Sequence, residues 1–508
     1  MKVLKAAEMS SADRRAIEYY GIPSVVLMER ASLGLFRAIR DEFPYAKRVL
    51  VVAGKGNNGG DALALVRHMH LHGYKVDYLL PLGEDLKGDA KLQFDILLKL
   101  GKEPLKEFPS GGYDLIVDGL FGTGFRPPVD EKASRVIVWI NSLGVPVVSV
   151  DIPSGLSADK HTIYEPSVRA DLTVTFAFPK VCHVLHPAAK RCGKVVVVDI
   201  GIPEQAAEGV KRWIIGDVEV PKREVDVHKG IMGHVLLVGG SLGKTGALMI
   251  SARACTRTGS GLVSVGVPKG LSHIFESSLV EEMSIPLPGD ERLDEKALNL
   301  ILSMKDRFSA LAVGMGMDRY KEGQRIVCGL LEGWEGPLLL DADGLNNLSD
   351  GKCLELLKRR KSPTVLTPHV GEFSRLTGYS KEYILENFID LALEFSTNYS
   401  CYLVLKSSRT AVATPDGKVF ISLRGTPAMA KGGVGDALAG VLTSLLGRGM
   451  HVEDALKLGV FLHGIAGEIA HEKLHRESIG AMDLVECIPE AYKRIENGTV
   501  TDSISLIV

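Results

Sequence analysis

Two glycine-rich segments carry the side chains of this sequence that are best suited to chemistry. The first, KGNNGGDALA, contains Asn57, Asn58 and Asp61, and the second, KGGVGDALAG, contains Asp436. Each places an aspartate after flexible glycines and before an apolar run of helical periodicity. The shared letters GDALA raise the question of whether one chemical device is used twice.

The first segment formally matches a dinucleotide-binding fingerprint, since Gly54, Gly56 and Gly59 have the GxGxxG spacing. Asp61 argues against that function, because it would stand at the helix start, where a pyrophosphate normally takes the positive end of the helix dipole. Two amides and a carboxylate are better suited to holding hydroxyl groups or a cation. The structural alternative is that the glycines permit a tight turn and an asparagine caps the helix.

Two further apolar runs end in polar side chains. VDGLFGTGFRPP carries Asp118, and SVDIPSGL carries Asp151 and Ser154. In an open parallel sheet the loops that follow the strands share one edge and form a crevice. Each aspartate alone could be a loop cap, but three polar turns at one edge predict a site.

The second glycine-rich segment differs from the first in its charge. Gly432, Gly433 and Gly435 precede a long apolar helix whose first turns contain one acid, Asp436. The backbone NH groups of such a turn can surround a phosphoryl group, and the neighbouring carboxylate can take a proton from an attacking hydroxyl. The structural alternative is a glycine turn that caps the helix through Asp436.

Short apolar runs that alternate with helical patterns must position both segments. In the first part of the chain they are residues 48–54, 74–82, 113–119, 145–151, 170–176 and 194–200, and in the second part 234–241, 262–268, 310–317, 337–344, 363–369 and 401–408. Such runs predict parallel sheets covered on both faces. The charged stretch 216–230 separates the two series. We therefore expect an α/β fold with two doubly wound domains, residues 1–220 and 221–508, the second ending in helices.

Composition supports two cores and argues against several partners. A chain of 508 residues exceeds the roughly 250 to 300 residues at which single cores stop growing. With 60 basic and 62 acidic residues, the net charge of -2 attracts neither nucleic acid nor an anionic membrane. No membrane span and no secretory apolar core is visible, so we expect a cytoplasmic protein. Reduced core thiols are expected at all seven cysteines, which are Cys182, Cys192, Cys255, Cys328, Cys353, Cys401 and Cys487.

The motifs KGNNGGDALA, VDGLFGTGFRPP and DIPSGL resemble the N-terminal domain of bifunctional NAD(P)H-hydrate repair enzymes over roughly residues 1–220. This resemblance implies a Rossmann-like three-layer domain that epimerises the R and S hydrates of nicotinamide cofactors. It implies substrate contacts from Asn57, Asn58, Gly59, Gly60, Asp61, Gly122, Thr123, Gly124, Phe125, Arg126, Pro127, Pro128 and Asp151. It also implies a potassium site at Asn58, Asp118 and Ser154, whose oxygen ligands suit that hard ion.

The implied epimerisation needs one group that passes a proton either way. The hydrate carries a hydroxyl on a carbon beside the ring nitrogen. Its protonation lets water leave, the nitrogen lone pair stabilises the planar cation, and water adds again from the other face. Asp151 is our hypothesised acid and base for these steps. Lys180, in FAFPK, could assist, although a solvated surface lysine is the preferred interpretation.

The second part of the chain resembles the nucleotide-dependent dehydratase domain of the same enzymes, and GGVGD is a motif of ribokinase-like enzymes. HKGIMGHVLLVGGSLGKTGA, VGMGMD, LDADGLN, LTPHVGEFSRL and LVLKSSRTAV carry the match over roughly residues 223–495. The resemblance implies that Gly316, His369 and Asp436 contact the hydrate, although His369 could instead be structural. Asp436, which can take a proton from an attacking hydroxyl, is our hypothesised catalytic residue. The resemblance also implies nucleotide contacts from Lys406, Ser407, Ser408, Arg409, Thr410, Gly433 and Gly435.

The implied dehydration uses ADP as phosphoryl donor. ADP phosphorylates the ring hydroxyl of the S hydrate, and elimination restores the cofactor and releases AMP and phosphate. Magnesium is expected, although no metal cage is visible in the sequence. The expected partners are NADH and NADPH hydrates, ADP and further copies of the chain. The alternative is a small-alcohol kinase of ribokinase-like fold, fused to a module that binds a nucleotide or a protein.

Overall fold

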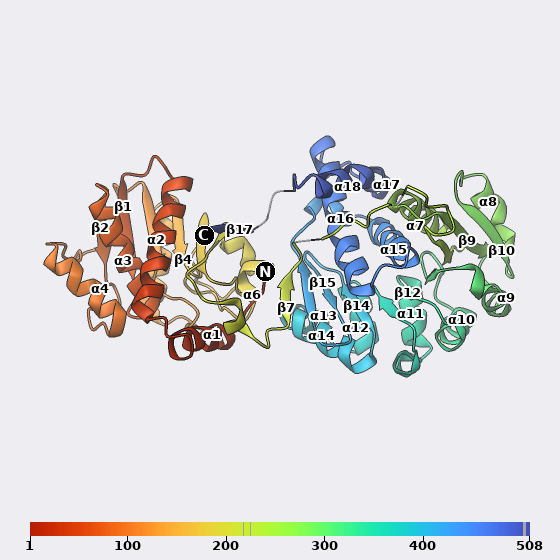
Figure 1. The fold of residues 1–508 in the computed structure, drawn as a ribbon, viewed down its shortest axis with the longest axis horizontal. Coiled ribbons are helices and arrows are strands. Elements are labelled where there is room, and N and C mark those ends of the chain that lie inside the picture. Colours follow the sequence, from red (N-terminus) through yellow and green to blue (C-terminus); the bar gives the residue numbers. More distant parts are fainter. Residues whose placement is uncertain (217, 224, 501–503, 508) are drawn as a thin grey trace. The chain divides into compact units, whose positions relative to one another are not determined.

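Figure 1 shows the computed structural model, which describes residues 1–216, 218–223, 225–500 and 504–507. The chain forms two compact units. The first contains residues 1–212 and the last strand, β17 (Ile504–Ile507), and the second begins at Trp213. Each unit has a largely parallel sheet between helices, which confirms the predicted α/β class with two sheets.

Within the described residues, the first unit has a seven-stranded parallel sheet in the order β17-β6-β5-β4-β3-β1-β2. Its other strands, which the six predicted runs contain, are β1 (Arg48–Ala53), β2 (Lys75–Leu79), β3 (Leu115–Gly119), β4 (Val147–Val150), β5 (Leu172–Phe176) and β6 (Lys194–Val198). Its helices are α1 (Ala6–Glu18), α2 (Ser24–Glu42), α3 (Asn57–Leu71), α4 (Gly88–Lys99), α5 (Glu131–Ser142) and α6 (Val181–Val184), with the 3-10 turns η1 (Ala188–Arg191) and η2 (Glu204–Ala207).

Alternation along β1 explains why both faces of this sheet are covered. Val49 and Val51 belong to one buried cluster, and Leu50 and Val52 belong to another. Successive strand residues point to opposite faces, so a continuous apolar run needs apolar partners on both sides.

The second unit has a ten-stranded sheet within the described residues, in the order β10-β9-β8-β11-β12-β13-β14-β15-β16-β7. The strands are β7 (Arg212–Ile214), β8 (His234–Val238), β9 (Leu262–Pro268), β10 (Met283–Leu287), β11 (Ala310–Val313), β12 (Leu338–Leu340), β13 (Thr364–Leu366), β14 (Tyr402–Leu405), β15 (Thr410–Ala413) and β16 (Val419–Ser422). The helices are α7 (Thr245–Thr258), α8 (Ser272–Glu276), α9 (Ala297–Ser303), α10 (Lys321–Gly333), α11 (Asp343–Asp350), α12 (Val370–Thr377), α13 (Lys381–Glu386), α14 (Phe388–Tyr399), α15 (Val434–Gly447), α16 (Val452–Lys473), α17 (Ala481–Glu486) and α18 (Ile488–Glu496).

The division between the units differs from the expected boundary between residues 220 and 221. The second unit begins at Trp213, because β7 joins its sheet beside β16. The expectation that the second domain runs to residue 508 and ends in helices holds only as far as α18. After α18, the last strand β17 pairs in parallel with β6, so the end of the chain belongs to the first unit.

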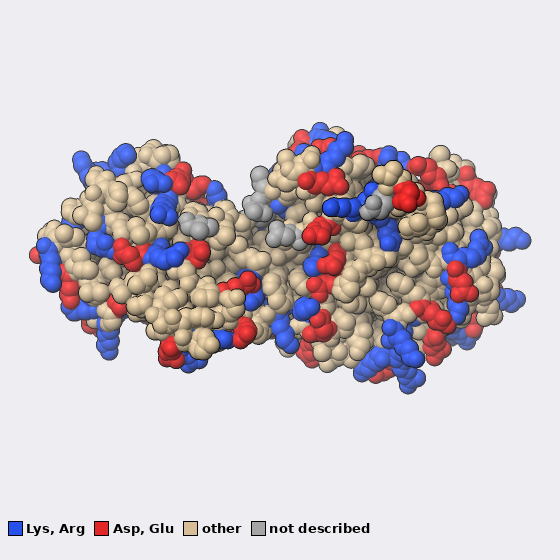
Figure 2. All heavy atoms as spheres, in the orientation of Figure 1, with Lys and Arg blue, Asp and Glu red and all other residues tan. Residues whose placement is uncertain are grey.

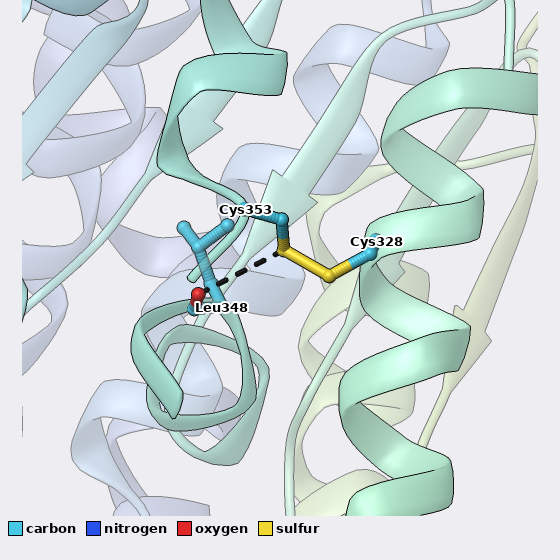
Figure 3. Close-up of a disulfide and its surroundings, with 3 residues drawn as sticks. All are labelled: Cys328, Leu348 and Cys353. Atoms are coloured by element: carbon cyan, nitrogen blue, oxygen red, sulfur yellow. Dashed lines mark hydrogen bonds between the residues drawn. A yellow bond between two sulfur atoms is a disulfide. The ribbon is translucent and has the colours of Figure 1, made fainter. Parts of the chain in front are cut away.

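The expectation that all cysteines are reduced thiols is wrong for two of them (Figure 3). Cys328 of α10 and Cys353, just before the 3-10 helix η5 (Leu354–Arg359), form a disulfide with Cα atoms 5.9 Å apart. The Cys353 Sγ also lies 3.8 Å from the Leu348 carbonyl oxygen. The two residues are 25 positions apart and share no motif, so only the packing of α10 against the following segment brings them together. The other five cysteines are free and buried.

On the face shown in Figure 2, the described residues of each unit form no large field of one charge. In Figure 2 the basic and acidic side chains are interspersed over the visible face of each unit. This pattern agrees with the near balance of 60 basic and 62 acidic residues. Within the residues that the structure describes, no helix has both the length and the apolar character needed to cross a membrane.

Candidate functional site

The first site lies at the carboxyl ends of β1, β3, β4 and β5, which are neighbours in the sheet. The loops after these strands meet at one edge, as expected for a parallel sheet. A cavity of about 910 Å³ lies there. The predicted substrate contacts that line it are Asn57, Asn58, Asp61, Gly122, Thr123, Gly124, Phe125, Arg126 and Asp151.

Four predicted contacts are not among the lining residues of this cavity. Gly59 instead lets α3 begin close to β1, because a Cβ there would lie 1.9 Å from the Gly54 carbonyl oxygen. A Cβ on Gly60 would lie 2.5 Å from the Met28 side chain. Pro127 and Pro128 follow the lining residues of the β3 loop. The two glycines therefore allow the first turn of α3 to pack closely against its neighbours.

Asp151 and Lys180 form a buried ion pair at the floor of the site. The Lys180 Nζ lies 2.6 Å from the Asp151 Oδ1, and the lysine side chain is only 1% exposed. The same ammonium donates hydrogen bonds to the Thr175 Oγ1 and the Phe176 carbonyl oxygen. Although burial opposes it, the Lys180 charge keeps the pKa of Asp151 below its usual value. The interpretation of Lys180 as a solvated surface lysine is therefore wrong.

Asn58 and Ser154 hold the Phe121 peptide between them. The Asn58 Nδ2 donates to the Phe121 carbonyl oxygen at 2.9 Å, and the Phe121 NH donates to the Ser154 Oγ at 3.0 Å. Ser154 in turn donates through its hydroxyl to Asp118 at 2.6 Å. Burial raises the pKa of Asp118, while hydrogen bonds from Ser154 and Ser149 oppose this effect. Among the described residues, the buried Asn58 Oδ1 has no hydrogen-bond partner.

Helix α1 contributes a face to the cavity that the sequence analysis missed. The residues of this face are Ala6, Ala7, Met9, Ser10, Asp13 and Ile17. Their spacing of three and four positions is the available signal, since it places an acid in line with apolar residues on one side of a helix. A backbone bridge between Leu4 and Lys180 holds the start of α1 beside the ion pair.

Asp13, Asp61 and Asp89 also line this cavity, and the pKa of two of them is raised. Burial raises the pKa of Asp13 to about 6, with the Lys180 charge opposing the rise and Asp151 adding to it. Burial, followed by the negative Asp151 and Asp13, raises the pKa of Asp61 well above its usual range. The cavity therefore brings together carboxyls of different protonation around one ammonium group.

The second site lies at the carboxyl ends of β11, β12, β13 and β14, with the start of α15. Asp341 follows β12, and its Oδ1 lies 2.7 Å from the Lys406 Nζ, which follows β14. The Thr367 hydroxyl donates to the same carboxylate oxygen at 2.7 Å. The amide of Lys406 donates to the Pro368 carbonyl oxygen, so the loops after β13 and β14 run side by side.

Asp436 lies in the first turn of α15 and close to this ion pair. Burial raises the pKa of its carboxyl to about 6; Asp341 adds to the rise and Lys406 opposes it. A Cβ on Gly435 would lie 3.2 Å from the Lys406 Nζ, so the ammonium group stands directly over the helix start. Gly433 precedes the helix with a φ of +88°, a conformation that favours glycine. A carboxyl, an ammonium group and the first turn of α15 therefore lie close together.

The predicted substrate residues of this unit have structural partners as well. The His369 Nδ1 accepts hydrogen bonds from the Gly371 and Glu372 amides, so the ring caps α12, while more than half of its side chain is exposed. Burial, followed by the Lys406 charge, lowers the pKa of His369. Gly316 has a φ of +64°, and a Cβ there would lie 2.3 Å from the Lys244 carbonyl oxygen.

The predicted nucleotide contacts after Lys406 form the turn between β14 and β15. Ser407 and Ser408 are exposed, and Thr410 begins β15. The guanidinium of Arg409 donates to the Leu423 carbonyl oxygen of the neighbouring strand end. This turn follows the same sheet edge as Lys406.

Comparisons with known proteins match both units in order. The family model "YjeF-related protein N-terminus" matches residues 24–182, and "NAD(P)H-hydrate dehydratase" matches residues 235–490. The bifunctional NAD(P)H-hydrate repair enzyme Nnr of Moorella thermoacetica is 37% identical over 99% of this chain and 98% of its own. The chain belongs to the family of bifunctional NAD(P)H-hydrate repair enzymes. The bifunctional NAD(P)H-hydrate repair enzyme Nnr of Thermofilum pendens is 35% identical, and the match covers 97% of this chain and 97% of that protein.

Membership in the NAD(P)H-hydrate repair family makes the protein an enzyme with an epimerase domain followed by a dehydratase domain. Among solved structures, the ADP/ATP-dependent NAD(P)H-hydrate dehydratase of Bacillus subtilis, co-crystallised with ATP and Mg²⁺, is 27% identical with a TM-score of 0.48. The match covers 54% of this chain and 94% of that one.

Proposed function

We propose that the protein repairs hydrated NADH and NADPH at two separate sites. The first unit interconverts the R and S hydrates, and the second uses ADP to dehydrate the S form with release of AMP and phosphate. The observation that carries this proposal is the similarity to bifunctional repair enzymes over 99% of the chain. The carboxyl groups of Asp151 and Asp436 at two sheet edges supply the chemistry that each reaction needs.

In the epimerase site, Asp151 faces the ring carbon that loses its hydroxyl. That carbon becomes part of a cation when water leaves, and a fixed carboxylate in a cavity stabilises the cation. Lys180 is a positioning residue, since it holds Asp151 ionised and in one orientation. We expected Asp151 to act as both acid and base. The ion pair favours its action as the base, because an ionised carboxylate accepts a proton but has none to give.

Potassium fits the oxygen atoms around Asn58. A buried amide oxygen without a donor is costly unless something binds it, and the Asn58 Oδ1 is such an atom. Asp118 and Ser154 belong to the same hydrogen-bonded cluster and have oxygen atoms suited to a hard cation. We propose that these three residues hold potassium, which supplies positive charge next to the dinucleotide.

In the dehydratase site, Asp436 takes the proton of the hydrate hydroxyl as its oxygen attacks the terminal phosphorus of ADP. The amides at Gly433 and Gly435 and the Lys406 ammonium stabilise the charge of the transferred group. Loss of phosphate, and of a proton from the neighbouring ring carbon, then restores the dihydronicotinamide. His369 and Gly316 are the proposed hydrate contacts, and Ser407, Ser408, Arg409 and Thr410 are the proposed nucleotide contacts.

Magnesium is expected to arrive with the nucleotide. Within the described part of the chain, no group of three or more His, Cys, Asp or Glu side chains could hold a metal ion. Asp341 and Asp343 already pair with Lys406 and Lys244. The phosphates of ADP are therefore its expected ligands.

The decisive experiment is to incubate the full chain with mixed R and S hydrates of NADH plus ADP and follow the absorbance of reduced nicotinamide. We expect complete conversion by the wild type and no conversion by Asp436→Asn. With Asp151→Asn, conversion should stop once the S hydrate is exhausted. A phosphorylated product that accumulates without reduced nicotinamide would contradict the proposal and favour a small-alcohol kinase. The cytoplasmic location and the homo-oligomer stay predictions.

A further inference from the structure

Asp13 is a carboxyl of the epimerase cavity that the reaction scheme does not yet use. It lines the cavity from α1, whereas Asp151 and Lys180 follow β4 and β5. The Leu4–Lys180 bridge anchors the start of α1 beside the ion pair, and Asp13 is electrostatically coupled to both Lys180 and Asp151. The cavity therefore has two carboxyls on different elements near one ammonium group.

The environments of three of the four cavity carboxyls, Asp13, Asp61 and Asp151, assign them different tasks. Lys180 and Thr175 bind Asp151 directly and keep its pKa low, so this group is ionised. Asp61 is buried, and burial, followed by the negative Asp151 and Asp13, raises its pKa well above its usual range, which favours its protonated form. Asp13 is less enclosed, and burial raises its pKa only to about 6, close to neutrality, where a general acid works best. Two carboxyls whose pKa values are pushed apart are the usual arrangement for an acid and its ionised partner.

We propose that Asp13 is a catalytic residue of the epimerase site, and that its carboxyl gives a proton to the departing hydroxyl of the hydrate. This inference rests on the proposed epimerase function. The acid of the reaction then comes from α1, a helix outside the glycine-rich motifs, and Asp151 acts as the base.

In the forward direction, each proton transfer has a donor and an acceptor. Asp13 protonates the ring hydroxyl, the carbon–oxygen bond breaks, and water leaves with that electron pair. The ring nitrogen lone pair forms a double bond to the carbon, and the cation lies near the Asp151 carboxylate. Water adds to the opposite face through an oxygen electron pair, the π pair of the carbon–nitrogen double bond returns to the nitrogen, and the extra proton of the water goes to Asp151. From Asp151 the proton returns through the water of the cavity to Asp13.

Other charged groups near α1 have partners of their own. Among the residues of the cavity wall, Lys55 pairs with Asp85. Asp89 also lines the cavity, and its negative charge adds to the rise in the pKa of Asp61. The 3-10 turn η2 packs against α1, and its Glu204 pairs with Lys2.

Further charged groups on or beside α1 also have partners, among them Glu8, whose carboxylate pairs with Arg212. Glu208, just after η2, pairs with Arg15 on α1. Arg126 of the cavity wall donates to the carbonyl oxygens of Thr123 and Phe125. The charges of Lys180 and Asp151 act on the pKa of Asp13, and Asp13 in turn raises the pKa of Asp61.

The test follows the interconversion of the R and S hydrates of NADH by the full chain without ADP, over a pH range that brackets 6. For the wild type, kcat/KM should fall about tenfold per pH unit above about 6, because the acid must be protonated. Asp13→Asn should lower kcat by roughly 10²- to 10⁴-fold, leave KM within about threefold, and remove this falling limb. Glu18→Gln is the matched control, since it removes a carboxylate from an exposed position on the same helix.

Each outcome supports or overturns the inference. If the wild type does not interconvert the hydrates, the proposed epimerase function itself fails. If the wild type is active and Asp13→Asn keeps kcat and the falling limb, the assignment of Asp13 is wrong. It is also wrong if Asp61→Asn rather than Asp13→Asn removes the limb, or if Asp13→Asn raises KM strongly and leaves the limb in place, as for a structural role.

Discussion

Replacement of Lys180 by methionine tests whether the ion pair holds the epimerase site together. The side chain keeps nearly its length but loses the ammonium group that binds Asp151, Thr175 and Phe176. At an effective dielectric constant of about 20, two charges 2.6 Å apart attract by roughly 6 kcal/mol, and the desolvation of the ammonium offsets part of this. Removing one partner of a buried pair leaves the other charge uncompensated, so we expect Lys180→Met to lower the free energy of unfolding of the first unit by about 3 to 5 kcal/mol near neutral pH.

The sign of the pH dependence provides a second check. In the wild type the pKa of Asp151 is lowered, so its stabilising contribution is present above the unfolded value of 3.8 and is lost as the pH falls through the lower folded value. Without Lys180, burial alone would raise the pKa of Asp151, and the folded variant would then take up a proton more readily than the unfolded chain. The gap in stability between variant and wild type should therefore shrink as the pH falls.

The assay is a urea titration read by hydrogen exchange of peptides that cover β4 and β5, which reports on the first unit alone. Lys194→Met is the control, since its ion pair with Glu42 is exposed and should be worth no more than about 1 kcal/mol. The double variant Lys180→Met/Asp151→Asn should recover part of the loss, because no buried charge is then left unpaired. If Lys180→Met costs no more than Lys194→Met, the argument for a buried ion pair is refuted.

Further predictions concern the second unit. Asp436→Asn should lower kcat/KM of the ADP-dependent dehydration by about 10²- to 10⁴-fold. Wild-type activity should rise with pH through about 6, because the base must be ionised. An unchanged rate in the variant would show that Asp436 is not the base. Gly440→Ala should destabilise this unit by about 2 to 3 kcal/mol in urea titrations, since its Cβ would lie 2.2 Å from the Ser251 carbonyl oxygen. The control Gly246→Ala, whose Cβ meets open space, should be neutral or stabilising by up to about 1 kcal/mol. Reduction of the disulfide between Cys328 and Cys353 should lower the free energy of unfolding of this unit by about 3 kcal/mol, measured by the same titrations with and without reductant. Mass spectrometry of the unfolded, unreduced protein should count five free thiols. Seven free thiols would show that the pair is reduced.

The candidate site could be predicted from the sequence as far as local patterns reach. Apolar runs located the strands β1 to β6, and their ends located Asp61, Asp118 and Asp151, because parallel strands direct all such loops to one edge. The hairpin of β15 and β16 was missed, although its PDG turn between alternating runs is a recognisable signal. Strand β10 was missed because Pro286 and its half-exposed pattern are untypical of a buried strand.

By itself the sequence determined two parallel-sheet units and the loops that carry their chemistry, since strand and helix periodicity are properties of neighbouring residues. Only the tertiary structure decided the surroundings of those loops. It buried Lys180 against Asp151, brought Asp13 into the cavity from α1, joined Cys328 to Cys353 and returned β17 to the first sheet. Burial and charge pairing depend on residues far apart in the chain, and the protonation of a carboxyl follows from its burial and its charged neighbours.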